Sequence, residues 1–145
     1  MKFNQGYFRP NHPEKYIGDI NDIVYRSSWE LKVMRRCDTE KNIVQWSSET
    51  MVIPYWSRAD NRMRRYFVDF IIKVREKSGE LKTWLVEVKP KSQTVPPVHS
   101  KGKKKKTILT EEYTWMVNND KWNAAKAFAD KNGMGFMILT EDSIL

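Results

Sequence analysis

This sequence of 145 residues contains a single cysteine, no internal repeat and no long apolar run. The one cysteine, Cys37, excludes an internal disulfide and is typical of a reducing compartment; we expect it to pack inside a helix. No stretch approaches the length that a membrane span requires, and residues 1–6 contain no apolar signal region. The sequence therefore predicts a soluble protein with no membrane partner, located inside a cell or carried within a particle.

What the sequence does contain is an excess of positive charge. Lysine and arginine number 26 against 18 acidic residues, which gives a net charge of +8 and a pI near 9.6. This charge suits a polyanionic partner, although ribosomal and membrane-surface proteins share it. At 17.3 kDa the chain is long enough for one hydrophobic core, so we expect residues 1–145 to form a single domain.

Apolar periodicity and turn residues predict an α/β domain. Residues 1–20, with Pro10, Pro13 and several aromatic residues, predict an extended arm that covers the core or binds a partner. The last expected strand follows a helix, which allows parallel pairing and predicts a mixed sheet. The expected elements after the arm are, in order, a helix over 21–34, strands near 51–55, over 66–72 and ending at 89, a short helix over 107–118 capped by Thr110, a helix over 120–132 stopped by Gly133, and a buried strand over 135–140.

Three charged residues stand inside the apolar strands. Asp69 lies within the run 66–72, and Glu87 and Lys89 lie at the end of the next run. Burial of such charges is costly unless they have partners. Strand alternation places Glu87 and Lys89 on one face, about 7 Å apart at ~3.3 Å per residue. The pattern favours a divalent-metal site. A solvated face of an amphipathic hairpin is the alternative, which the apolar neighbours on the same face weaken.

The turn between the two strands sets their register. Residues 77–80 form a polar turn signal, and a hairpin centred there pairs Asp69 with Val88. A one-residue adjustment, common where a loop carries a bulge, pairs Asp69 with Glu87 or Lys89. Opposed carboxylates destabilise a sheet unless a cation joins them. Mg²⁺ prefers oxygen ligands and keeps several waters, so it is the expected cation, with Mn²⁺ as a substitute.

Glu30 is a candidate third acid. It lies in the expected helix over 21–34, beside a stripe that includes Val24, Ser27 and Met34, and would point toward the sheet. The alternative is a capping box, in which Ser27 and Glu30 tie down the start of the helix. A helix that begins at residue 21 or 22 excludes the capping box, so the position of the helix start distinguishes the two interpretations.

Four segments carry a resemblance to a known family. The D…E-x-K arrangement resembles the PD-(D/E)xK nuclease superfamily, with Val68 where that family often has a proline that is not a ligand. Within it, the chain resembles the head completion nucleases of T4-like bacteriophages and the catalytic domain of the Tn7 transposase end-cleaving subunit. The resemblance spans nearly the whole chain and rests on YRSSWE at 25–30, IPY at 53–55, RYFVDF at 65–70 and VEVKPK at 86–91.

The resemblance implies a restriction-endonuclease-like core, with a central mixed four-stranded sheet flanked by helices. It implies that Glu30, Asp69, Glu87 and Lys89 are the catalytic set, and that the three acids hold the metal of a Mg²⁺-dependent endonuclease. The expected substrate is DNA, bound without sequence preference or through its ends or structure, with phage head or neck proteins as further partners. The expected task is to process packaged DNA ends before tail joining, in the host cell cytoplasm or on the virion.

Two groups of basic residues are candidates for phosphate contact. Residues 90–106 predict an irregular basic loop, whose lysines would contact phosphates without reading the sequence. Arginines 62, 64 and 65 come just before the Asp69 strand. A solvated loop is the alternative for both groups, and His99 in the first of them is left out of the site. The candidate DNA-binding residues are Arg64, Arg65, Lys91, Lys101, Lys103, Lys104, Lys105 and Lys106.

Other interpretations stay open at this stage. A non-catalytic DNA-binding or head–tail-joining protein could keep the same fold, although the complete set of three acids and a lysine argues against it. A transposase-type DNA end-cleaving subunit would need a partner recombinase. Trp46 and Trp56 flank the strand near 51–55, and we expect packing to be their role in preference to stacking on unpaired bases.

Overall fold

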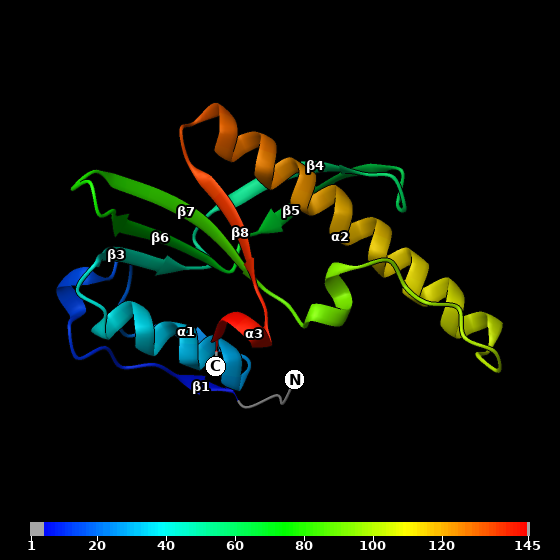
Figure 1. Cartoon of the computed structure of the whole chain (residues 1–145), viewed down its shortest axis with the longest axis horizontal. Helices are drawn as coiled ribbons and strands as arrows, with labels where there is room; N and C mark the ends of the chain where they lie inside the picture. The colour runs from blue at the N-terminus through cyan, green and yellow to red at the C-terminus, as the bar shows by residue number, and fades with distance from the viewer. Residues whose placement is uncertain (1–4, 145) are drawn as a thin grey trace.

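A mixed four-stranded sheet organises the molecule (Figure 1), which a computed structural model describes for residues 5–144. The sheet contains β3 (Ile43–Ser48), β6 (Phe70–Arg75), β7 (Leu81–Val88) and β8 (Gly135–Leu139), in the order β3-β6-β7-β8. The first three strands are antiparallel, and β8 runs parallel to β7 after a crossover through a helix. The predicted α/β fold with a mixed four-stranded sheet, consistent with a restriction-endonuclease-like core, is confirmed.

Helices cover both faces of this sheet, because β7 is apolar on both of its faces. α1 (Ser28–Thr39) lies below the sheet in Figure 1, and α2 (Lys105–Lys131) lies above it. On the α1 side, Val86 packs in a cluster with Met34 and Trp46. On the α2 side, Leu85 packs with Trp122 and the small α2 residues beside it. The end of β7 therefore lies between two hydrophobic cores, where solvent has little access.

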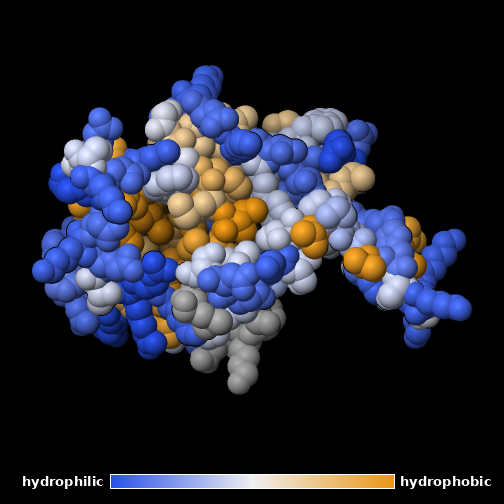
Figure 2. All heavy atoms as spheres, in the orientation of Figure 1, coloured by the Kyte–Doolittle hydropathy of each residue, from blue (hydrophilic) through white to orange (hydrophobic). Residues whose placement is uncertain are grey.

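The α1 side of the sheet is only partly covered. Figure 2 shows apolar side chains over the sheet between α1 and α2, surrounded by hydrophilic residues. An open groove there is lined by apolar residues of all four strands and by α1, including Val74, Trp84, Met137 and Leu139. No helix within residues 5–144 is both long and apolar enough to cross a membrane.

The N-terminal arm packs against the core. Its described part contains β1 (Gly6–Tyr7) and a 3-10 turn, η1 (Pro13–Lys15). Phe8 and Tyr16 are buried edge-on against Trp46, with ring centroids 5.9 and 4.7 Å away. Phe8 and Tyr16 thus pack against the core, which is one of the two roles expected of the arm, whereas residues 1–4 lie outside the described part. Trp46 is 1% exposed, so its predicted packing role is also confirmed.

α1 begins seven residues later than predicted. Residues 24 and 25 form a short strand, β2 (Val24–Tyr25), that pairs with β1, so the expected helix over 21–34 is wrong in its first half. Ser27 is the N-cap, and its hydroxyl accepts a hydrogen bond from the Glu30 backbone N at 3.1 Å. The capping signal therefore determines the start of the helix. Cys37 is buried in this helix, as predicted.

The expected strand over 66–72 is wrong, because the chain divides there into two strands. β4 (Val52–Ser57) and β5 (Arg62–Phe67) form a separate antiparallel hairpin, and β6 starts after Asp69. Val68 is fully buried at the break, and its N–H donates to the carbonyl of Met51. The strand near 51–55 thus belongs to this hairpin. The first strand of the central sheet is instead β3, which the sequence analysis missed.

α2 is one helix of 27 residues, so the two expected helices over 107–118 and 120–132 are wrong. The polar residues at the expected break stay helical because they have tertiary or local partners: Asp120 accepts from Arg58, and the Asn119 side chain donates to the carbonyl of Trp115. Thr110 lies inside the helix and donates to the carbonyl of Lys106, so it is not the cap. Gly133, with φ +67°, follows the C-terminus as predicted.

The basic loop is consequently shorter than the expected 90–106. It begins with a 3-10 turn, η2 (Lys91–Thr94), and ends at Lys104, the N-cap of α2. Lys105 and Lys106 belong to the first turn of the helix. A short final helix, α3 (Glu141–Ile144), follows β8 and was not predicted.

Candidate active site

Two carboxylates meet at the end of the central sheet. β6 and β7 pair Phe70 with Val86, and the same register carried one residue further sets Asp69 opposite Glu87. This is one of the two adjusted registers that the sequence allowed. Asp69 lies in the break before β6, where its Oδ2 accepts a hydrogen bond from the Val88 N–H at 2.8 Å. The backbone of β7 therefore helps to hold the Asp69 carboxylate beside Glu87.

Burial sets the electrostatics of this pair. Glu87 is 5% exposed, and burial raises the pKa of its carboxyl. Burial also raises the pKa of Asp69 well above its usual range, and repulsion from Glu87 raises it further. Two such carboxylates disfavour ionisation together unless a cation lies near them. The pair thus behaves as one unit that needs positive charge.

Three side chains surround Glu87. The Tyr66 hydroxyl donates to Glu87 Oε2 at 2.5 Å, and Lys89 Nζ lies 3.7 Å from Glu87 Oε1. Burial and the charge of Glu87 raise the pKa of Tyr66, so the phenol stays a donor. Lys121, on α2, has its ammonium 5.6 Å from the centroid of the Tyr66 ring; burial lowers its pKa, and the charge of Glu87 opposes that shift. The structure thus brings a tyrosine and two lysines to the acid pair formed by Asp69 and Glu87.

Glu30 lies at the edge of this site. Its Oε1 accepts a hydrogen bond at 3.3 Å from the N–H of Arg26, the residue before the N-cap, so Glu30 helps to cap the helix in a variant of the capping box that the sequence offered as the alternative. The pKa of its carboxyl is raised, mainly by burial and then by the charge of Asp69. Within residues 5–144, no three acidic, histidine or cysteine side chains gather closely enough to hold a metal ion. Glu30 therefore lies near Asp69 but does not form a three-acid cluster with Asp69 and Glu87.

The acid pair fits a hard divalent cation. Asp69 and Glu87 supply carboxylate oxygens from adjacent strands, which is the donor type that Mg²⁺ and Mn²⁺ prefer. The buried, mutually repelling charges are an arrangement that a cation would stabilise. Both observations concern this chain's own residues, and both support the predicted ligands.

Three residues of the site were missed by the sequence analysis. Tyr66 is the one buried residue of β5, and its place three residues before Asp69 was a usable signal. Glu49 lies between β3 and β4; its N–H donates to the Asp69 carbonyl, and its side chain pairs with Arg26 at 2.5 Å. Lys121 comes from α2, and no spacing in the sequence connects it to the acids.

The predicted DNA-binding residues lie outside this cluster. Arg64 pairs with Asp60 at 3.1 Å, and the guanidinium of Arg65 lies 5.5 Å from the ring centroid of Phe67. Both arginines belong to β5 and not to a loop. On the same hairpin Trp56 is 52% exposed, in contrast to Trp46.

The lysines downstream of the site have different surroundings. Lys91 pairs with Asp142 at 3.0 Å, and Lys103 pairs with Glu111 at 2.9 Å while donating to the carbonyl of Val98. Lysines 101, 104, 105 and 106 are exposed and form no ion pair within the described chain. His99, which was left out of the site, pairs with Glu112.

Comparison with known proteins gives two matches. Residues 40–141 match the TnsA-like endonuclease N-terminal family. The head completion nuclease of Enterobacteria phage T4 is 44% identical to this chain over 142 residues, which cover 96% of the chain and 92% of that protein. No solved structure matches the chain. The family match includes Asp69, Glu87, Lys89 and Lys121, and the T4 protein matches the chain over nearly its full length.

Proposed function

The chain belongs to the TnsA-like endonuclease N-terminal family, and from this premise we propose that it is a Mg²⁺-dependent DNA endonuclease of the PD-(D/E)xK type. Its task would be to process packaged DNA ends during phage head completion, before tail joining. The observation that carries the proposal is the buried pair of Asp69 and Glu87, with Lys89 Nζ 3.7 Å from Glu87. A structural protein would have little reason to bury repelling acids next to a lysine.

Asp69 and Glu87 would hold the metal ion, and Glu30 would complete its surroundings through water. A divalent cation bound there supplies positive charge to the scissile phosphate and makes a bound water more acidic. The tyrosine hydroxyl on Glu87 Oε2 fixes the orientation of that carboxylate, which leaves Oε1 toward Lys89. The site is thereby arranged before the substrate enters.

Lys89 would orient the attacking water and stabilise the charge that grows on the phosphate. The Lys89 side chain is 28% exposed, so its ammonium can contact a substrate while it stays near Glu87. Lys121 is half-buried, burial lowers its pKa, and its ammonium would supply a further positive charge near Glu87. Because water is the nucleophile, no covalent enzyme intermediate forms.

The proposed partners follow from this chemistry. DNA would bind without sequence preference or through its ends, with Arg64, Arg65 and the exposed lysines of 101–106 as candidate phosphate contacts. Phage head or neck proteins would be further partners, in the host cell cytoplasm or on the virion. Mn²⁺ would replace Mg²⁺, since both accept carboxylate ligands.

A plasmid-nicking assay tests the proposal. Supercoiled plasmid should be converted to nicked or linear DNA with Mg²⁺, and the conversion should stop with EDTA. Asp69→Asn should abolish it, while Asp130→Asn, which changes an exposed acid on α2, should leave it intact. Binding without any cleavage by the wild type would instead indicate a non-catalytic joining protein. Cleavage that needs a partner recombinase would indicate a transposase-type subunit.

A further inference from the structure

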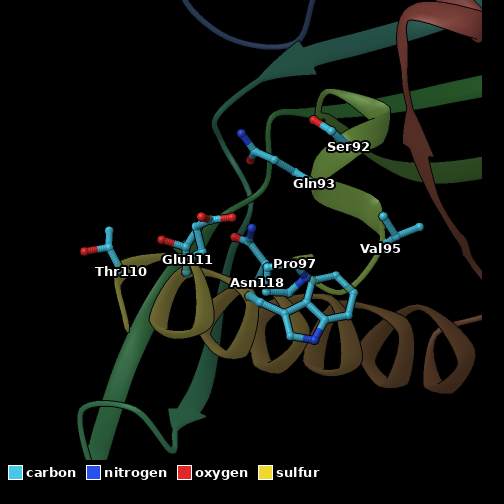
Figure 3. A pocket seen from close by; sticks show the side chains of 9 residues that line it. Ser92, Gln93, Val95, Pro97, Thr110, Glu111 and Asn118 are labelled. Atoms are coloured by element: carbon cyan, nitrogen blue, oxygen red, sulfur yellow. The ribbon is translucent and has the colours of Figure 1, made fainter. Parts of the chain in front are cut away.

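A cavity of about 350 Å³ lies beside the active site, between α2 and the segment that follows Lys89 (Figure 3). This volume is within the range of small-molecule sites, roughly 300–1,000 Å³. None of the predicted catalytic residues lines it. The residues that do are Ser92, Gln93, Val95, Pro97, Thr110, Glu111, Thr114, Trp115 and Asn118.

Both walls of the cavity are connected to the catalytic residues. On α2, Asn118 lies one helical turn before Lys121, so their Cβ atoms are about 5–6 Å apart on the same face. On the opposite wall, Ser92 lies only three residues after Lys89, which limits the separation of their Cα atoms to about 10 Å. A nucleotide next to a phosphate held at Lys89 can therefore reach the cavity.

Asn118 is the polar centre of the cavity. Its side chain is 5% exposed and lines the cavity. It points from α2 toward the η2 segment, while Gln93 approaches from the other wall (Figure 3). The side-chain amide of asparagine carries both a donor and an acceptor, which a ligand in the cavity can use. Asn and Gln amides match the edges of nucleobases, which carry a donor and an acceptor side by side.

The other walls suit a flat, uncharged group. Trp115, Pro97 and Val95 supply apolar surface, and the indole can stack on an aromatic ring. The only charged residue in the lining is Glu111, whose carboxylate pairs with Lys103 at 2.9 Å. The Glu111 carboxylate would repel a phosphate, whereas it would not repel a neutral base. The same lysine donates to the carbonyl of Val98, so it fastens the 98–103 segment to α2.

We propose that this cavity binds the base of the nucleotide that flanks the scissile phosphate, in a strand where that base is unpaired. The inference rests on the proposed nuclease function and specifies its substrate class. A base that is paired and stacked in a duplex cannot enter such a pocket without being extruded. The enzyme therefore selects DNA ends or junctions that carry unpaired nucleotides, by structure and not by sequence.

Single-turnover cleavage of two matched substrates tests the selection. One duplex has a fully paired end, and the other differs only by mismatched nucleotides at the same end. The wild type should cut the mismatched substrate about tenfold faster, which corresponds to about 1.4 kcal/mol. Asn118→Leu keeps the side-chain size and removes both hydrogen bonds, so it should abolish this ratio. Gln93→Leu, on an exposed residue of the other wall, should reduce the ratio without endangering the fold.

Asn119→Leu is the matched control. Asn119 neighbours Asn118 on α2, but its amide donates to the carbonyl of Trp115 and it does not line the cavity. This variant should keep the wild-type ratio. If the control loses the ratio as well, or if Asn118→Leu and Gln93→Leu both keep it, the cavity has no role in substrate choice.

A crosslinking measurement makes the test independent of activity. In the Lys89→Ala background, a 5-iodouracil placed at the unpaired position should crosslink to Trp115 on irradiation, and Asn118→Leu should reduce the yield at least severalfold. A crosslink that maps to the β4–β5 hairpin instead would overturn the proposal. A wild type that cuts no DNA substrate would refute the nuclease function itself, whereas cutting without any preference for unpaired ends would refute only the role of the cavity.

Discussion

At the end of the central sheet, Asp69 and Glu87 form a buried pair whose carboxyl pKa values are both raised by burial, with Lys89 beside Glu87. The lysine tract, which consists of Lys101, Lys103, Lys104, Lys105 and Lys106, lies mostly in solvent, where one lysine can replace another. Low dielectric surroundings strengthen interactions between charges, and water and salt weaken them. The loss of one charge should therefore abolish cleavage in the first region, whereas in the second it should only weaken DNA binding by a small step.

Among the substitutions in the two regions, Lys89→Ala should reduce the cleavage rate most. If the lysine stabilises the transition state, cleavage at saturating DNA should fall on the order of 10²–10³-fold or more, while DNA and metal binding stay close to the wild type. Single-turnover kinetics and a binding titration measure the two separately. Lys82→Ala, on the same strand with its ammonium over Trp84, is the control and should cut normally. A wild-type rate in Lys89→Ala would remove this lysine from the mechanism.

Asp69→Asn should separate stability from catalysis. The folded state holds the Asp69 proton more tightly than the unfolded chain does, so above the usual carboxyl range the ionised pair destabilises the metal-free protein. The amide removes that repulsion and keeps an acceptor for the Val88 N–H. The melting temperature without metal should rise by several degrees, roughly 1 kcal/mol for a domain of this size.

The same variant should also lose the stabilisation that Mg²⁺ gives the wild type by linkage. Thermal melts across a Mg²⁺ titration measure this, with Asp130→Asn as the exposed control. Equal stabilisation of Asp69→Asn and wild type by Mg²⁺ would show that Asp69 is not a ligand.

Glu30 both caps α1 and lies near Asp69, so two substitutions distinguish its roles. Glu30→Gln keeps an acceptor for the Arg26 N–H and removes the charge, so the rate should fall about tenfold with little change in melting temperature. Glu30→Ala loses both, and should also cost about 0.5–2 kcal/mol of stability. A normal rate in Glu30→Gln would make Glu30 a capping residue alone.

Changes in the lysine tract should have the smallest effect on chemistry. Replacing the exposed lysines 101, 104, 105 and 106 by serine should flatten the slope of log affinity against log salt by about 0.9 for each phosphate that is no longer neutralised, equally for unrelated duplexes. Single-turnover cleavage at saturating DNA should change little. Lys103→Ser is the internal comparison, because its ammonium is held by Glu111 and should leave the slope unchanged. An unchanged slope in the fourfold variant would assign the tract to a solvated surface.

The acid pair was predictable because its members are close in sequence. The alternation of β7 fixes Glu87 and Lys89 on one face, and a short hairpin turn leaves only a one-residue choice for the partner of Asp69. The order of apolar runs likewise predicted a mixed sheet flanked by helices. These are local properties of the chain, which period and turn chemistry determine.

The errors occurred where local signals competed with distant contacts. The polar residues at 118–120 favour a break, but the partners of Asp120 and Asn119 keep α2 continuous. The apolar run around Asp69 favours one strand, but the burial of Val68 and its hydrogen bond to Met51 divide it. In both places tertiary packing contributed more free energy than the intrinsic preference of the segment.

By itself, the sequence determined that Glu87 and Lys89 share one face at the end of β7, and it supplied the capping residues that start α1, since each depends on residues a few positions apart. Only the tertiary structure decided that Lys121 lies near Glu87, that Glu30 lies near Asp69, and that Asn118 lines a cavity with Ser92 and Gln93. These relations join residues far apart in the sequence. They depend on how α1 and α2 pack against the sheet, and no periodicity along one segment contains that information.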